Sequence, residues 1–82
     1  MFHKVKNVKA LENYILKIEF QEGTIKYYDV KTLFRKWKAF EVLETDIELF
    51  NNVKVDQGGY GISWNEDIDL SCEELWNNGT LK

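Results

Sequence analysis

Residues 60–79, YGISWNEDIDLSCEELWNNG, are the stretch of this chain that decides its fold. In its first part, Tyr60, Ile62 and Trp64 alternate with small or polar residues. Alternation with a period of two places three large side chains on one face of an extended strand. The stretch therefore predicts a strand, followed by an acidic turn and a helix.

The second part of the same stretch has the pattern of a short capped helix. Ser71 followed by Glu74 is a capping box, in which the hydroxyl accepts from a backbone N–H and the carboxylate reaches back. Asn78-Gly79 supplies residues that tolerate positive φ where the helix should stop. Three apolar residues recur at helical spacing and predict the buried stripe: Cys72, Leu75 and Trp76. We expect Trp64 and Trp76 to pack in the core.

The N-terminal half predicts three consecutive strands. Residues 5–11 form the first, with a bulge that reconciles their imperfect alternation. Residues 14–20 alternate cleanly, and Gly23 then allows a hairpin turn into residues 24–30. Alternation leaves open which pair of the last strand faces the core, Ile25 and Tyr27 or Tyr28 and Val30.

The middle of the chain predicts short helical segments. Thr32 is placed to cap one whose apolar side chains are Leu33, Phe34 and Trp37, and Asp46 to cap another. Further core positions are expected at Phe40, Leu43, Ile47 and Phe50. A strand then begins at Val53 and Val55, and Gly58-Gly59 turns the chain back toward Tyr60. The expected fold is a single α+β domain over residues 1–82, a small antiparallel sheet built of hairpins with two short helices packed on it.

Composition supports a small soluble domain. Of 82 residues, 44% are hydrophobic and 15% aromatic, enough for a packed core. A single cysteine cannot form an intramolecular disulfide, which suits a reducing compartment. The N-terminus lacks the apolar run of a signal peptide, and no stretch approaches the roughly 20 apolar residues of a membrane span. We expect a cytoplasmic protein that does not contact a membrane.

Several of these patterns occur together in one known family. The matching residues are Tyr14-x-Leu16-x-Ile18-x-Phe20-x-x-Gly23, Tyr28-Asp29-Val30, Phe50, Gly61-Ile62-x-Trp64, Asp67-Ile68-Asp69 and Leu75. With them the chain resembles, over nearly its whole length, the bacterial family called domain of unknown function 2442. It departs at Asn65-Glu66, where many members have proline and an added glycine.

The resemblance implies a small bacterial α+β domain. It also implies a partner, since members often sit beside the gene of another small protein in an arrangement like a toxin–antitoxin pair. Some members carry an added helix-turn-helix region. This chain ends at Lys82 without one, so direct reading of DNA is not expected.

Candidate chemistry is sparse. His3 and Cys72 are the only histidine and cysteine, so nitrogen and sulfur ligands cannot complete a zinc site. Cys72 is expected to be a buried apolar residue, because no base accompanies it as a nucleophile. Five acidic residues lack the spacing of a calcium loop and are expected to be solvated charges at the helix start: Glu66, Asp67, Asp69, Glu73 and Glu74. We expect no metal, no cofactor and no catalytic residue.

Charge is distributed unevenly along the chain. Residues 1–38 hold nine basic and four acidic side chains, and residues 39–82 hold two and ten. Cations around Trp37 have the composition of a nucleic-acid contact; these candidates are Lys31, Arg35, Lys36 and Lys38. The alternative, which we favour, makes Trp37 a core anchor with a solvated basic rim.

Three function classes follow in order of preference. The first is a small non-enzymatic protein-interaction module, including the antitoxin-like or regulatory half of a two-gene bacterial pair. Its partner would be another small protein encoded next to it, with a homodimer as the competing assembly. The second is a nucleic-acid-binding accessory using the basic N-terminal half. The third is an enzyme of unknown class, not expected because no nucleophile, base and orienting group can be assembled.

Overall fold

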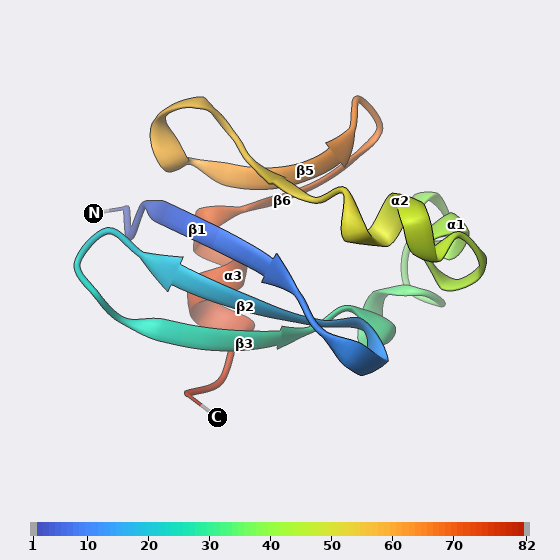
Figure 1. The fold of residues 1–82 in the computed structure, drawn as a ribbon, viewed down its shortest axis with the longest axis horizontal. Coiled ribbons are helices and arrows are strands. Elements are labelled where there is room, and N and C mark those ends of the chain that lie inside the picture. The colour runs from blue at the N-terminus through green and yellow to red at the C-terminus, as the bar shows by residue number, and fades with distance from the viewer. Residues whose placement is uncertain (1, 82) are drawn as a thin grey trace.

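Two three-stranded antiparallel sheets form the framework of the protein (Figure 1). The computed structural model describes residues 2–81. The first sheet has the order β1-β2-β3, with β1 at Val5–Ala10, β2 at Ile15–Phe20 and β3 at Ile25–Asp29. The second has the order β4-β5-β6, with β4 at Lys54–Val55, β5 at Gly61–Asn65 and β6 at Ile68–Ser71. The α+β class is confirmed, and the strands are divided between two sheets.

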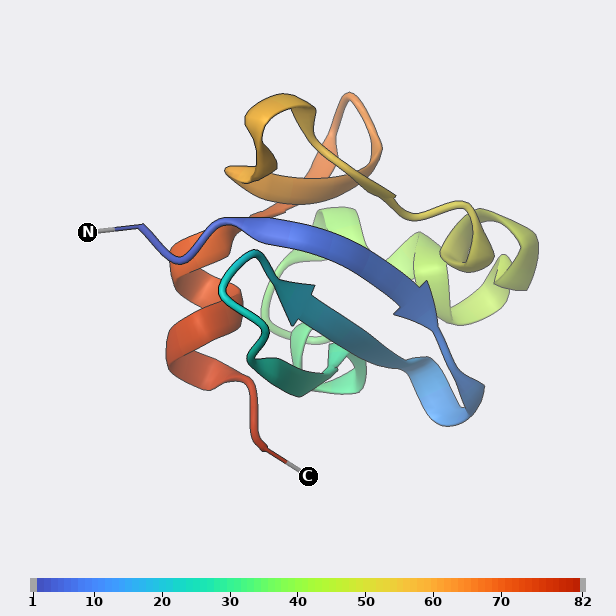
Figure 2. The same ribbon diagram turned by 60° about the vertical axis from the view of Figure 1, so that its left-hand side comes forward.

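Short helices close the open sides of these sheets. They are α1 at Glu41–Thr45, α2 at Ile47–Asn51 and α3 at Cys72–Asn78. Four 3-10 turns accompany them: η1 at Glu12–Tyr14, η2 at Val30–Leu33, η3 at Lys38–Phe40 and η4 at Gln57–Gly59. Helix α3 lies behind the first sheet, whereas α1 and α2 lie beside its end (Figures 1 and 2). No helix of residues 2–81 is long and apolar enough to cross a membrane.

Strand β2 carries the buried face of the first sheet. Its inner side chains Leu16, Ile18 and Phe20 are fully buried. Tyr28 in β3 and Val30 just after it are buried in the core. The sequence pattern alone did not decide between this pair and Ile25 with Tyr27. The expected bulge in the first strand is present, as a shift of register between Val5 and Asn7.

The second sheet contains a strand that the sequence analysis missed. Ile68 and Leu70 of β6 are buried and alternate with exposed side chains. The acidic turn before it is only a tight connection, in which the Asn65 side chain accepts hydrogen bonds from the backbone N–H groups of Asp67 and Ile68. Ile68 and Leu70 also alternate with polar residues in the sequence. The prediction missed this strand because it placed Asp69 among the charges at the start of the helix.

Two side chains expected in the core are exposed instead, Trp37 by 41% and Ile47 by 51%. Tyr60, which alternation placed on one face with Ile62 and Trp64, is 50% exposed. Tyr60 has helical φ and ψ and precedes β5, so it does not share the alternation of Ile62 and Trp64. Ile47 begins a helix of five residues that buries only Phe50. Trp37 N–H still donates to the Leu33 carbonyl at 3.1 Å, but Trp37 itself is extended, with φ of −129° and ψ of 122°, so the helical spacing assumed for its side chain does not apply.

The helix ends show which capping signals were correct. Asp46 caps α2 by accepting from Leu49 N–H at 3.1 Å, as expected. Asp29, rather than Thr32, caps η2 by accepting from Lys31 N–H at 3.0 Å. Gly79 ends α3 with φ of −75°, so positive φ is not required there. A side chain at Gly79 is excluded by close approach, because its Cβ would lie 2.5 Å from the Leu75 carbonyl oxygen.

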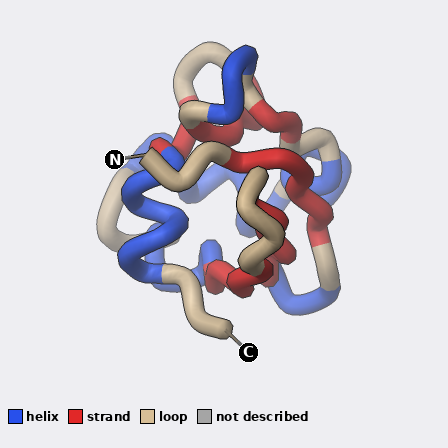
Figure 3. Tube along the Cα trace, turned by 90° about the vertical axis from the view of Figure 1, so that its left-hand side faces the viewer, coloured by secondary structure: helices blue, strands red, loops and turns tan. Residues whose placement is uncertain are grey.

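A single core lies between the two sheets and the helices, with α3 on one side of it (Figure 3). Trp64 lies inside it, 5% exposed, and its Nε1 donates to the Phe50 carbonyl at 3.0 Å. Trp76 is only partly buried and lies at the margin, so the expectation of a core position holds for Trp64 alone.

Replacing Trp64 tests this arrangement. Trp64→Ala should lower the free energy of unfolding by about 3–5 kcal/mol, because it empties a core site and leaves the Phe50 carbonyl without a donor. That is a large part of the about 4–12 kcal/mol expected for a domain of this length. Trp37→Ala is the matched control and should cost less than about 1 kcal/mol, since Trp37 is exposed. Equal shifts of the two urea midpoints would contradict the assignment.

Candidate functional site

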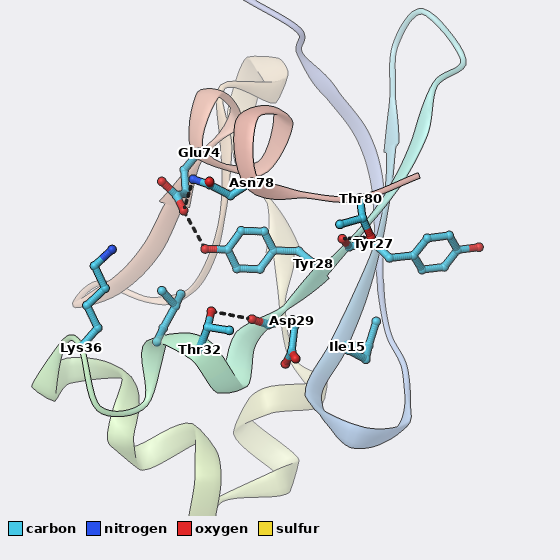
Figure 4. Close-up of a pocket in the computed structure, with 10 residues that line it drawn as sticks. Ile15, Tyr27, Tyr28, Asp29, Thr32, Lys36, Glu74, Asn78 and Thr80 are labelled. Atoms are coloured by element: carbon cyan, nitrogen blue, oxygen red, sulfur yellow. Dashed lines mark hydrogen bonds between the residues drawn. The ribbon is translucent and has the colours of Figure 1, made fainter. Parts of the chain in front are cut away.

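A groove opens between β3, the η2 turn and α3 (Figure 4). Its volume is ≈ 700 Å³. The groove brings together residues from both ends of the chain, since β3 and α3 are separated by the whole of the second sheet. Its lining consists of Ile15, Tyr27, Tyr28, Asp29, Thr32, Leu33, Lys36, Glu74, Asn78 and Thr80. The groove is lined by both apolar and hydrogen-bonding groups.

A three-residue hydrogen-bond chain joins the two walls of the groove. The Tyr28 hydroxyl donates to Glu74 Oε2 at 2.7 Å, and Asn78 Nδ2 donates to the same oxygen at 2.9 Å. Burial raises the pKa of the Tyr28 hydroxyl, and the hydrogen bond to the Glu74 carboxylate and its negative charge raise it further. Tyr28 is therefore a fixed hydrogen-bond donor at neutral pH.

This chain of hydrogen bonds corrects the predicted capping box. Ser71 Oγ accepts from Glu74 N–H at 3.1 Å, as the box requires. The Glu74 carboxylate does not reach back, because its bonds are made to Tyr28 and Asn78. Ser71 therefore caps the helix, whereas Glu74 links α3 to β3 through its hydrogen bond with Tyr28.

The outer edge of β3 forms the upper wall of the groove and is partly occupied by the chain itself. Tyr27 N–H donates to the Thr80 carbonyl at 2.6 Å, and Thr80 N–H donates to the Tyr27 carbonyl at 2.8 Å. The segment after α3 thus pairs with β3 as a short antiparallel addition. Pairing at Tyr27 shows that this edge accepts an extended segment of chain.

The basic side chains proposed from the sequence do not form one cluster. Lys31 pairs with Asp29 at 3.0 Å and donates to the Asn13 carbonyl, so its charge is already neutralised. Lys36 lies at the mouth of the groove. Arg35 and Lys38 are exposed beside it, and Trp37 lies between them with Lys36 Nζ 5.2 Å from its ring centre. The favoured interpretation of Trp37 as a core anchor was therefore wrong.

The remaining candidates lie outside the groove. Cys72 is buried, as expected. The His3 ring stacks on Trp76 with centroids 3.5 Å apart, and its Nδ1 lies 2.8 Å from a Glu22 carboxylate oxygen. Among residues 2–81, no group of three or more His, Cys, Asp or Glu side chains is arranged to hold a metal ion.

Sequence reasoning missed Tyr28, Asn78 and Thr80 as site residues. Tyr28 could have been predicted as a site residue from its possible core-facing position. A buried tyrosine needs a hydrogen-bond partner for its hydroxyl. Asn78 lies four residues after Glu74, a spacing at which helical side chains meet. Nothing in the sequence predicted the pairing of Thr80 with Tyr27, which are 53 positions apart.

Removing the Tyr28 hydroxyl tests the link between the walls. Tyr28→Phe should lower the free energy of unfolding by about 1.5 kcal/mol at neutral pH, since the variant cannot donate a hydrogen bond to the carboxylate. The folded pKa of Tyr28 is raised above its ordinary value of 10.0, so wild-type stability should also fall as pH rises above 10.0. That alkaline loss should be smaller in Tyr28→Phe.

Tyr27→Phe is the control for this prediction, since the Tyr27 hydroxyl makes no hydrogen bond to other described residues. It should leave both the neutral stability and its alkaline fall unchanged in chemical denaturation. A Tyr28→Phe variant with the same alkaline loss as wild type would show that the phenol does not hold its proton as described.

Comparison with known proteins gives one match. Searches of curated proteins and of solved structures find nothing that matches this chain. A family described as Protein of unknown function (DUF2442) matches residues 5–80, which include both sheets, α3 and the whole groove. The match covers nearly all of the sequence and agrees with the resemblance carried by the hairpin, by Trp64 and by the residues around α3. The chain belongs to this DUF2442 family.

Proposed function

We propose that this protein is a non-enzymatic interaction module that binds an extended segment of a second protein in the groove between β3 and α3. The observation that carries the proposal is the pairing of Thr80 with Tyr27. It supports edge addition, in which backbone hydrogen bonds supply affinity and side-chain pockets supply specificity.

The edge of β3 offers further groups to such a segment. Tyr27 directs its N–H and C=O away from β2, toward Thr80. Because hydrogen-bonding direction alternates along an antiparallel strand, Ile25 and Asp29 face the same side. The Asp29 carbonyl already accepts from Thr32 Oγ1 at 2.9 Å (Figure 4), so at Asp29 a partner would pair with the N–H. The stretch opposite Asp29, between Thr32 and Asn78, is the open part of the groove, and the partner segment would lie there.

Charge around the groove favours an encounter with a protein of mixed charge. Lys36 lines the mouth, with Arg35 and Lys38 exposed nearby, while Glu74 and Asp29 lie within the groove. Opposite charges separated in this way orient a partner during association more than they add to final affinity.

A non-enzymatic role fits the chemistry of the groove. The polar groups at its floor are bonded to each other, with Tyr28 and Asn78 both donating to Glu74. Neither His3 nor Cys72 lines it.

The partner we propose is the small protein that family members commonly have encoded beside them. This chain would be the antitoxin-like or regulatory half of a two-gene bacterial pair, acting in the cytoplasm. Burial of its free cysteine fits a reducing compartment.

Coexpression with the product of the neighbouring gene tests the proposal. Size-exclusion chromatography with light scattering should show a mixed complex for the wild type. Asn78→Trp places a large side chain over the groove and should weaken that complex at least about tenfold, equivalent to about 1.4 kcal/mol of binding free energy.

Asn77→Trp is the matched control, because Asn77 is the preceding residue of α3, is exposed and does not line the groove. It should bind as the wild type does, and circular-dichroism melts should show both variants folded. A homodimer that ignores the neighbour would overturn the proposal in favour of self-association. Equal weakening by the two variants would move the interface away from the groove.

A further inference from the structure

The outer face of the first sheet is a second surface without a covering element. Helix α3 and the second sheet lie on the other side of β2 or beyond its edge, and no described helix or strand crosses the front of β1, β2 and β3 (Figures 1 and 2). The accessibility of β2 agrees: its inner side chains are fully buried, whereas Lys17 and Glu19 on the outer face are partly exposed.

Strand register places two lysines and a tyrosine in one row across this face. Lys9 of β1 is paired with Lys17 of β2, and Lys17 is paired with Tyr27 of β3. Side chains directly opposite each other on one face have Cβ atoms about 4.5–5.5 Å apart. The Tyr27 ring points away from the groove, to the opposite side of β3 (Figure 4).

Neither lysine has an ion-pair partner among the described residues. One carboxylate, Glu19, lines the same shallow pocket as Lys9 and Lys17 and accepts from Asn7 Nδ2 at 3.2 Å, whereas Asp29 pairs with Lys31 at 3.0 Å. Among the described residues, Lys9 and Lys17 make no ion pair or hydrogen bond. Like charges directly opposite on a sheet destabilise it, and an anion bound between them would remove that repulsion.

We propose that this face binds single-stranded nucleic acid, with Lys9 and Lys17 contacting a backbone phosphate and Tyr27 stacking on an adjacent base. Cations for phosphate and an aromatic ring for a base are the two elements of single-strand binding. The two hydrogen bonds between Tyr27 and Thr80 hold the backbone of the ring-bearing residue in place. A duplex keeps its bases stacked inside and offers none to the ring.

This row differs from the basic segment around Trp37. There Lys36 Nζ already lies over the indole ring, 5.2 Å from its centre, so the cation occupies the surface a base would need. Lys9, Lys17 and Tyr27 instead come from three adjacent strands, whose spacing is fixed by the sheet. The Arg35, Lys36 and Lys38 segment therefore provides a control at a second basic surface, where the variant removes one charge more than the Lys9 and Lys17 variant.

Fluorescence anisotropy with a short labelled oligouridylate, measured at several salt concentrations, tests the proposal. The double variant Lys9→Gln/Lys17→Gln should bind at least about tenfold more weakly. Its slope of log affinity against log salt should be shallower by about 0.7 for each phosphate that the variant no longer neutralises. Tyr27→Ala should weaken binding about five- to a hundredfold with little change of slope, and Tyr27→Phe should restore it.

Three outcomes would overturn the proposal. One is no binding of the oligonucleotide by the wild type at low salt. Another is weaker binding by Arg35→Gln/Lys36→Gln/Lys38→Gln together with wild-type affinity in the Lys9 and Lys17 variant. The third is equal affinity for a DNA duplex of the same length, which would indicate attraction of charge alone.

A measurement without ligand checks the electrostatic premise. Lys17→Gln should raise the thermal midpoint at low salt, because it removes the repulsion from Lys9, and the difference should shrink as salt screens the pair. A midpoint that falls in Lys17→Gln at low salt would show that the two charges do not repel, and would remove the reason for an anion at this position.

Discussion

Burial of one face of β2 is the constraint on which the rest of the structure depends. Leu16, Ile18 and Phe20 are fully buried on that face, yet a three-stranded sheet alone can cover only one side of such residues. Helix α3 supplies part of the cover through Leu75, which is itself fully buried. The second sheet and the short helices supply the rest.

Positioning α3 requires more than apolar contact. At one end of the helix, Ser71 caps it and Glu74 is held by the Tyr28 hydroxyl. At the other, Trp76 packs edge-on against Phe20, with His3 stacked on it and Lys26 Nζ 4.0 Å from its ring centre. The Lys26 ammonium also donates to the Trp76 carbonyl at 2.6 Å, near the helix C-terminus where a cation is favourable. These contacts set the distance between α3 and β3, and that distance creates the groove.

The first sheet consequently has two different working surfaces. Its β3 edge and the side facing α3 form a groove with paired backbone and a hydrogen-bonded floor, where we propose that an extended peptide binds. Its outer face has no cover and carries Lys9 and Lys17 without carboxylate partners among the described residues. The two surfaces share Tyr27, whose backbone belongs to the groove and whose ring points to the other side (Figure 4).

The sequence by itself determined the local structure wherever a pattern is repeated within a few residues. Alternation specified β2 and β5, the Asp46 and Ser71 caps specified where α2 and α3 begin, and the class of fold followed. Tertiary structure decided which side of an element is covered, which local patterns do not contain. It exposed Trp37, Ile47 and Tyr60 and chose Tyr28 over Tyr27 as the buried residue of β3. The groove also escaped prediction, because Tyr28 and Glu74 meet across 46 positions and only the packing of α3 on the first sheet brings them together.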